Sequence, residues 1–302
     1  MSGMASHLQE IIFRATQGGW ATGHFNASEA DHIRAIVEAC RDAGAPAIIG
    51  MSEGERSHLG LLEAVALCDA FRKEFGIPIF LNADHTKSVE KAKEGIDAGF
   101  DSIHIDLSAL PYEENIAHTQ EIVEYAHSKH SNILENVGMS VEGELGYLRG
   151  ESRIQQEKIT VKKEDYTDPA QAADFVTRTG IDRLAIAVGN IHGISLDEPD
   201  LDIERIRAIR AAVPPEVALV LHAASGIPDD AIRSAIAAGI ANIHINTDLR
   251  TAYVAELKKS LAEHPDEAAM YKLDAPAIAA MKEVIKQKLT IFGATGMIKA
   301  SV

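Results

Sequence analysis

Short apolar runs alternate with stretches of helical periodicity along almost the whole chain. The apolar runs have the length and composition of buried strands, and they lie at residues 20–26, 46–52, 77–88, 101–108, 136–145, 183–189, 217–222 and 241–246. Between them, apolar residues recur every three or four positions, most clearly at residues 29–43, 112–130, 169–179 and 203–212, which is typical of amphipathic helices. Eight strands joined by helices predict an α/β fold, a (β/α)8 TIM barrel.

The pattern continues beyond the eighth strand with two further helices, at about residues 247–263 and 276–289. These exceed what closing a barrel requires, so we expect a C-terminal helical extension at about residues 264–302 that forms an oligomer contact or contributes to the site. No linker rich in Pro, Gly or Ser divides the chain, and residues 1–302 are predicted to form one domain. A doubly wound sheet fits less well, because no glycine-rich dinucleotide loop follows the first strand.

Composition and charge narrow the class of protein. The chain is 46% hydrophobic and 25% charged, without an apolar run long enough to cross a membrane, and its first residues lack the features of a signal peptide. We therefore expect a cytoplasmic protein without a membrane partner. The net charge of −16, with Lys and Arg outnumbered 29 to 45, argues against a nucleic-acid partner. Cys40 and Cys68 lie among apolar helical neighbours and are predicted to be reduced, packed thiols.

Candidate chemistry appears where the apolar runs end. The third run stops at Asp84-His85, and His192, His222 and Glu144 end three other runs in the same way. The carboxyl ends of barrel strands converge on one mouth, so these side chains are expected to share a pocket. Three imidazoles with an optional carboxylate suit Zn²⁺ or a similar divalent ion. The alternative for each single histidine is an ordinary core or surface role, since the chain has 13 of them.

The last two strand-to-helix loops carry a second candidate feature. Ser225 and Gly226 follow the seventh strand, and Thr247 follows the eighth, directly before a helix. Exposed amides at a helix N-terminus attract phosphate, and this part of the fold often holds it. The alternative is ordinary turn and capping chemistry.

Taken together, these residues carry a family resemblance. The segment NADHTKSVEKAKEGIDAGFDSIHIDLSALPYEENI, followed by VEGELG, AVGNIHGI, LHAASGIPDDAI and INTD, resembles the class II fructose-bisphosphate/tagatose-bisphosphate aldolases over nearly the whole chain. The resemblance implies a metal-dependent barrel that splits a ketose phosphate into dihydroxyacetone phosphate and an aldehyde. It implies one Zn²⁺ per subunit on His85, His192 and His222, with Glu144 able to join or leave, and a monovalent cation near the phosphate site. A homodimer or homotetramer is also implied.

The resemblance also suggests roles for other residues. Asp84 is the expected base for the C4 hydroxyl proton, because retro-aldol cleavage needs one there. Glu151, in a mobile glycine-rich loop GYLRGES after the fifth strand, is expected to exchange a proton at the neighbouring carbon. Asp106 matches a carboxylate that would orient a ligand histidine. Positions expected to contact substrate or its phosphate are Asn26, Ser52, Gly193, Ser225, Gly226, His244, Asn246 and Thr247.

The departures from the family pattern concern substrate choice. His244 stands where the family usually has an amide, Asn82 replaces the first residue of the usual H-x-D-H, and Ser152 aligns with the loop glutamate better than Glu151 does. Near residues 270–272 the family often has an arginine for a second phosphate, and none is found here. A bisphosphate, a ketose 1-monophosphate and another acidic sugar phosphate therefore all stay open as substrates. Candidate replacement cations are Lys87, Arg149, Arg153, Arg250 and Lys272.

Two alternatives of a different kind remain open. Lys87 after the third strand could form a Schiff base in a metal-independent lyase, which would leave the metal-ligand pattern unexplained. The changed residues His244, Asn246 and Ser152 are also compatible with a non-catalytic protein that binds a sugar phosphate or a metal.

Overall fold

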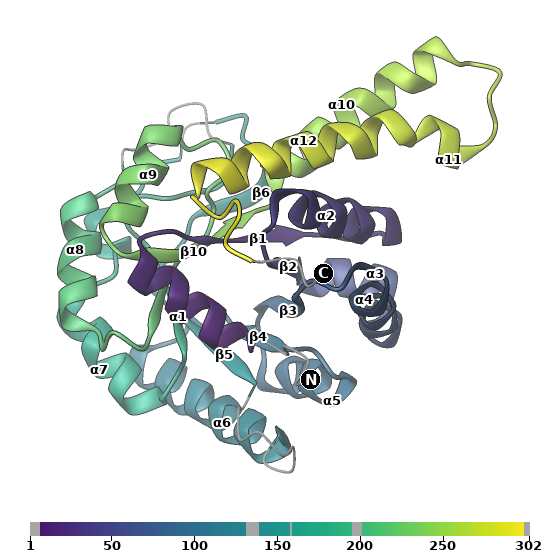
Figure 1. Cartoon of the computed structure of the whole chain (residues 1–302). Coiled ribbons are helices and arrows are strands. Elements are labelled where there is room, and N and C mark those ends of the chain that lie inside the picture. Colours follow the sequence, from purple (N-terminus) through teal and green to yellow (C-terminus); the bar gives the residue numbers. More distant parts are fainter. Residues whose placement is uncertain (1–6, 131–138, 158, 195–200, 299–302) are drawn as a thin grey trace.

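A closed barrel of eight parallel strands forms the centre of the molecule (Figure 1). The computed structural model describes residues 7–130, 139–157, 159–194 and 201–298. Around the barrel the strands follow the order β1-β10-β9-β7-β5-β4-β3-β2. Their bounds are β1 Thr22–Asn26, β2 Ala47–Met51, β3 Ile79–Thr86, β4 Ser102–Ile105, β5 Ser140–Leu145, β7 Arg183–Ile186, β9 Ala218–Leu221 and β10 Ile240–Ile245. All eight lie within or next to predicted runs, and the predicted barrel is confirmed.

The helices pack around the barrel and bury their apolar faces against the strands. Four of them, α6 Tyr112–His130, α7 Pro169–Thr179, α8 Ile203–Ala212 and α10 Thr247–Glu263, have the bounds that the sequence predicts. The others on the barrel wall are α2 Ala30–Ala43, α4 Leu61–Phe75, α5 Val89–Ala98 and α9 Asp229–Ala237, and α1 Leu8–Gly18 packs against β9 and β10. Two helices follow β2, because Gly60 at φ +98° separates α3 Glu53–Leu59 from α4.

A small second sheet lies beside the barrel. Strand β6 Gly150–Ile154 pairs in parallel with β8 His192–Ile194, and a short turn of 3-10 helix, η1 Lys163–Asp165, lies between them in sequence. The side chain of Gln155 donates to the His192 carbonyl at 2.9 Å, and Arg149 forms two hydrogen bonds with Asp165 at 2.6 and 2.8 Å. The prediction of a loop at residues 146–152 was therefore wrong for residues 150–152, which belong to a strand. No apolar run marks this strand, since the segment has only five residues and two of them are charged.

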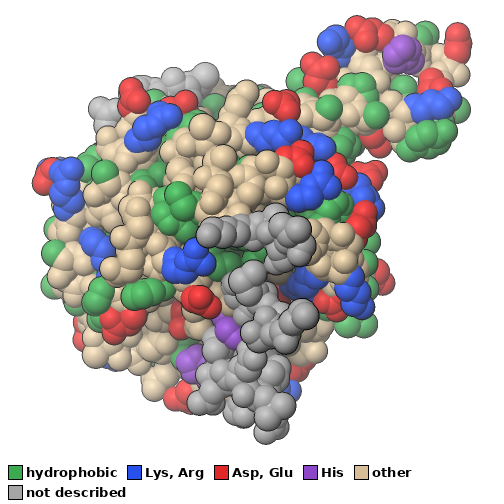
Figure 2. All heavy atoms as spheres, in the orientation of Figure 1, with side chains coloured by type: hydrophobic (Ala, Val, Ile, Leu, Met, Phe, Trp, Pro, Cys, Tyr) green, Lys and Arg blue, Asp and Glu red, His purple; other side chains and the backbone are tan. Residues whose placement is uncertain are grey.

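The last helices form an arm that projects from the barrel. Helix α10 runs outward, α11 Met270–Leu273 lies at the turn, and α12 Ala275–Ile291 returns to pack against α2 (Figure 1). Met270 and Tyr271 at the turn are exposed. On the face drawn in Figure 2, basic and acidic side chains are interspersed along the arm and the barrel. No helix among the described residues is long and apolar enough to cross a membrane.

Polar side chains fill the inside of the barrel. Ser102 donates to Asn82 Oδ1 at 2.6 Å, and Arg183 Nε donates to Ser140 Oγ at 3.1 Å. Arg183 also forms an ion pair with Glu142 at 2.7 Å, and their side chains are 1% and 0% exposed. Each buried charge thus has a partner, without which its desolvation would be very costly. The inside of the barrel therefore holds a hydrogen-bonded network that supports the residues at its mouth.

Candidate active site

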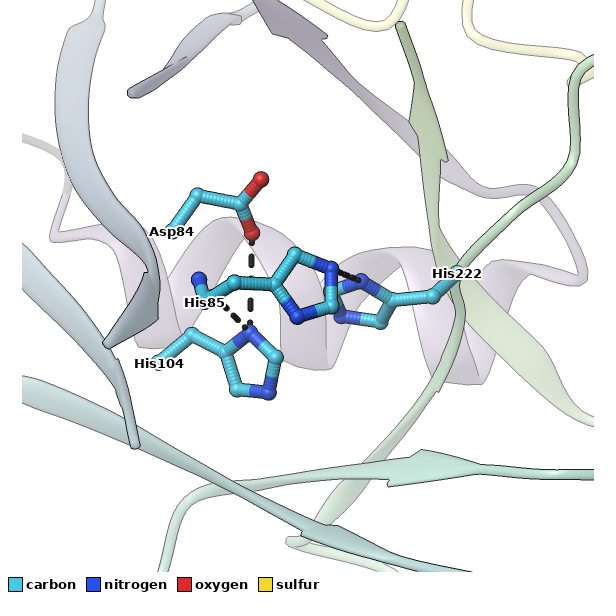
Figure 3. Close-up of side chains that lie close together, drawn as sticks. All are labelled: Asp84, His85, His104 and His222. Carbon is cyan, nitrogen blue, oxygen red and sulfur yellow. Dashed lines mark hydrogen bonds and ion pairs between the residues drawn. The ribbon is translucent and has the colours of Figure 1, made fainter. Parts of the chain in front are cut away.

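An irregularity in β3 brings Asp84 and His85 to the same side of the strand. Successive residues of a regular strand point to opposite faces. Here the register between β3 and β4 shifts between Ala83 and Thr86, and His85 has φ +40°. Both side chains consequently reach the inside of the barrel mouth, where they meet His104 and His222 (Figure 3). A non-glycine residue at positive φ costs on the order of 1–3 kcal/mol and persists only where its surroundings hold it.

The rings of His85 and His222 are each oriented by a carboxylate. His85 Nδ1 donates to Asp106 Oδ2 at 2.9 Å, and His222 Nε2 donates to Glu142 Oε1 at 2.6 Å. In the neutral form of each ring, the proton therefore lies on the side facing its carboxylate. The other nitrogens, His85 Nε2 and His222 Nδ1, face each other at 3.2 Å. With both rings neutral, these two nitrogens present lone pairs to the same point, so they are suited to sharing a cation.

The distance between these nitrogens fits a zinc ion. With Zn–N bonds of about 2.0–2.1 Å and tetrahedral angles, two ligand nitrogens lie about 3.3 Å apart. Ligand atoms of Asp84, His85, His104 and His222 all lie within 4.8 Å of one another. Within the described part of the chain, the buried atoms Asp84 Oδ1 and His104 Nε2 have no well-aligned hydrogen bond, although His104 Nε2 lies 3.2 Å from Glu144 Oε2. The residues present therefore fit a small divalent cation.

His192 and Glu144 occupy the edges of this group. His192 was predicted at the end of the sixth strand, but β7 ends at Ile186 and His192 begins β8. Its ring lies 4.9 Å from that of His85, centroid to centroid, and burial followed by the charge of His85 lowers the pKa of His192 to about 3. Glu144 in β5 accepts from Ser108 at 3.2 Å, and its Oε2 lies 4.0 Å from His85 Nδ1. Burial, then the nearby charge of Asp106, raises the pKa of Glu144.

Asp84 is held by an amide and surrounded by imidazoles. Its Oδ2 accepts from Asn26 Nδ2 at 2.9 Å, and its Oδ1 lies 3.5 Å from Nδ1 of both His104 and His244. Burial alone would raise the pKa of Asp84, but the charge of His85 and the nearby rings of His104 and His244 hold it well below the usual value. Asp84 is thus an ionised, oriented carboxylate that can accept a proton.

Three residues of this site were missed in the sequence. His24, His104 and Glu142 lie on β1, β4 and β5, two positions before Asn26, Asp106 and Glu144 respectively. Alternate residues of a strand share a face, so the residues two positions before each candidate should also point inward. That periodicity was the available signal. His104 accepts from the backbone amide of His85 at 3.2 Å, and His24 stacks on His244 with ring centroids 3.5 Å apart.

A cavity opens at the carboxyl ends of the strands beside this group. Among the described residues, it is lined by Asn26, Ser52, Asp84, His85, Ser152, His192, Gly193, His222, Ala223, Ser225, His244, Asn246, Thr247 and Arg250. Most predicted substrate positions therefore meet at one cavity. Gly226 is not among the lining residues. It has φ +80° and packs in a turn against Ile194. Glu151 belongs to β6, but its side chain lies outside the described residues.

The predicted phosphate loops lie at the start of α10. Asn246 is the N-cap of this 17-residue helix, and the Asp248 amide donates to Ser225 Oγ at 3.2 Å. Ala223, next to His222, has φ +57°. The first turn of α10 thus opens on the cavity, where its amides and dipole favour an anion.

The side chains predicted to replace the missing arginine differ in whether they line the cavity. Arg250 lines the cavity, whereas Lys272 lies at the tip of the arm and pairs with Glu267 at 2.8 Å. The side chain of Arg149 is held by Asp165, and Arg149 is not among the described residues that line the cavity. The side chain of Lys87 is exposed and does not belong to the described lining, which argues against a Schiff base at this residue.

Comparison with known proteins agrees with this geometry. Residues 6–297 match the family model described as fructose-bisphosphate aldolase class-II. Fructose-bisphosphate aldolases from Staphylococcus epidermidis and Staphylococcus aureus are each 35% identical over 295 residues, covering 97% of this chain and 98% of the relative. The crystal structure of the YdjI aldolase from Escherichia coli K12 is similar with a TM-score of 0.81 and 31% identity, covering 98% of this chain and 100% of that one. A putative fructose-1,6-biphosphate aldolase from Coccidioides immitis has a TM-score of 0.82 and 26% identity, with 97% and 98% covered.

Proposed function

We propose, from the premise that this chain belongs to the class II fructose-bisphosphate aldolase family, that it reversibly splits a ketose phosphate into dihydroxyacetone phosphate and an aldehyde. It is accordingly a carbon–carbon lyase of the metal-dependent class. The observation that carries this proposal is the pair of facing imidazole nitrogens, His85 Nε2 and His222 Nδ1, 3.2 Å apart beside the ionised Asp84.

We assign one Zn²⁺ per subunit to His85, His192 and His222, with Glu144 as the carboxylate that can join them. A divalent ion bound there would draw electron density from the substrate ketone at C2 and so favour cleavage of the adjacent bond. Asp106 and Glu142 keep the protons of His85 and His222 on the far side of each ring. The chain itself therefore supplies neutral, oriented ligands.

Proton transfer at the cleaved bond is assigned to Asp84. The carboxylate accepts the proton of the C4 hydroxyl, the C4–O bond becomes the aldehyde carbonyl, and the electrons of the C3–C4 bond remain on C3. Asn26 fixes the carboxylate for this step through its hydrogen bond to Oδ2. Glu151 is proposed to deliver the proton that C3 then requires, which completes dihydroxyacetone phosphate.

The phosphate of the donor half is assigned to the loops after β7, β9 and β10. Gly193, Ser225 and Thr247 line the cavity there, at the N-terminus of α10. The turn at Gly226 shapes the same edge, and a monovalent cation near the phosphate is part of the proposal. A negative group is favoured near the start of a helix, because the first-turn amides have no carbonyl partner within the helix and the dipole is positive there.

The proposal is tested by following dihydroxyacetone phosphate in D₂O by NMR. The hydroxymethyl carbon of this compound corresponds to C3 of the ketose. Hydrogen–deuterium exchange at this carbon requires the metal site and the Glu151 proton transfer but no aldehyde, so it is independent of which sugar is cleaved. We expect exchange that stops on chelation and returns with Zn²⁺. Asp84→Ala is expected to retain exchange and lose cleavage, whereas Glu151→Gln is expected to lose exchange.

Two outcomes would overturn this function. Saturable binding of dihydroxyacetone phosphate by zinc-loaded protein without exchange would support the non-catalytic alternative. Exchange that survives complete metal removal would contradict the metal-dependent mechanism.

A further inference from the structure

One buried carboxylate holds together the cavity wall on the Asp84 side. Glu55 of α3 is 5% exposed and lies behind this wall. It accepts hydrogen bonds from Asn26 Nδ2 at 2.9 Å, the Ser52 amide at 2.7 Å, Asn246 Nδ2 at 3.3 Å, and Arg250 Nη2. All four donors belong to residues that line the cavity. The Ser52 contact is part of the capping box of α3, but the other three come from β1 and the start of α10 and have no role in capping α3.

This wall borders the half of the substrate that becomes the aldehyde. Asn26 Nδ2 donates to Glu55 Oε2 and to Asp84 Oδ2, each at 2.9 Å. An amide nitrogen has two hydrogens, so both are engaged. Because Asp84 takes the proton of the C4 hydroxyl, the carbons beyond C4 must pass Asn26 and its neighbours.

The positive charge of this wall is already neutralised without a second phosphate. Arg250 is the one Lys or Arg side chain among the described residues that line the cavity, and Glu55 pairs with it. Asp84 adds a further negative charge one amide away. A phosphate placed here would face two carboxylates with one guanidinium, and the donors around it would first have to leave Glu55. Hydroxyl groups require no such change, since they can exchange hydrogen bonds with Asn26, Ser52 and Arg250 without adding charge.

We infer that the substrate is a ketose 1-phosphate whose aldehyde half is uncharged and hydroxylated where it passes the Glu55 wall. This inference rests on the proposed aldolase function and specifies its substrate class. Glu55 is then a specificity residue that acts through Arg250 and Asn26 to reject a phosphate at the distal end.

The test compares ketohexose 1-phosphates with the corresponding 1,6-bisphosphates as substrates of the zinc-loaded, full-length protein. The four D-isomers are included, because the stereochemistry of the sugar is not part of the inference. We expect kcat/KM for the best monophosphate to exceed that for the best bisphosphate at least tenfold. In Glu55→Gln the ratio of bisphosphate to monophosphate kcat/KM should rise at least tenfold, because Gln keeps the capping box while the charge is lost. Glu55→Ser provides a second variant should Gln not fold.

A matched control lies on the same helix. Glu53 accepts from the Lys87 amide at 2.9 Å and does not belong to the described lining. Glu53→Gln removes the same charge from α3 and should leave the substrate ratio unchanged.

The outcomes separate the inference from the function beneath it. A wild-type protein that exchanges dihydroxyacetone phosphate and cleaves a bisphosphate as well as any monophosphate would overturn the inference alone. A Glu55 variant that loses stability but keeps the wild-type ratio would show that the residue only caps α3. Absence of both exchange and cleavage would overturn the proposed function, and the inference with it.

Discussion

Replacing Asp106 tests whether the carboxylates behind the imidazoles set the affinity for the metal. Asp106 Oδ2 accepts from His85 Nδ1 at 2.9 Å, and its Oδ1 accepts from Ser108 Oγ at 2.8 Å. Its side chain is 14% exposed, so water replaces it poorly when it is removed. A hydrogen bond to a charged group contributes about 1.5–3 kcal/mol, and loss of such a partner typically lowers metal affinity about 10–100-fold.

We expect a graded series. Asp106→Asn keeps an acceptor for His85 but loses the charge, so Zn²⁺ affinity should fall about tenfold, or about 1.4 kcal/mol. Asp106→Ala removes the acceptor as well, so its Zn²⁺ affinity should fall about 100-fold. The assay is competition with a chromophoric chelator at fixed pH, together with thermal unfolding of the metal-free protein.

Asp101 provides the control, because it lies at the opposite end of the same strand. It precedes β4, where it accepts from the Leu81 amide at 2.6 Å and pairs with Arg72. Asp101→Asn should destabilise the fold and leave zinc affinity unchanged. An Asp106→Ala protein that binds zinc within twofold of wild type would refute the assigned role, as would an equal loss of affinity in the Asp101 variant.

Three further predictions concern the base, the barrel interior and the thiols. Asp84→Asn should lower kcat for cleavage about 10²–10⁴-fold with unchanged zinc content by elemental analysis; activity near wild type would exclude Asp84 as the base. Arg183→Leu leaves the Glu142 charge buried without its partner and should lower the free energy of unfolding by about 3–5 kcal/mol, of which Arg183→Leu/Glu142→Gln should recover at least half in denaturant titrations. Burial raises the pKa of both thiols, that of Cys68 to about 12, so they should be largely protonated and unreactive toward a thiol reagent at pH 8 until the protein unfolds; rapid labelling of native protein would contradict this.

The strands and most helices were predictable because their signals are local. Apolar runs and helical periodicity fix each element, and alternation of strands and helices fixes the barrel. Elements without a strong local signal were missed. Strands β6 and β8 are short and pair with each other, although they lie far apart in the sequence; Gln155 and His192, which are hydrogen-bonded beside this pair, are 37 residues apart. Pairing between such distant segments leaves no periodicity in either of them.

The site was only partly predictable for a related reason. The mouth residues Asp84, His85 and His222 end apolar runs and were found, whereas His104 and Glu142 lie inside such runs and were not. The irregularity at His85 was also invisible, since a register shift arises from pairing between β3 and β4. Glu55 escaped notice because it lies in a polar helical stretch, where a carboxylate is normally solvated.

The shift in β3 has a consequence for how this protein can diverge. Asp84 and His85 are adjacent in sequence, and one irregularity of one strand places both the assigned base and an assigned metal ligand. The residues that border the aldehyde half come instead from β1, from α3 with its N-cap, and from the start of α10. Reaction chemistry and substrate choice are therefore inherited on separate segments. Mutations on α3 or at the start of α10 can explore new sugars while the reaction itself is conserved, and an insertion in β3 would abolish every activity at once.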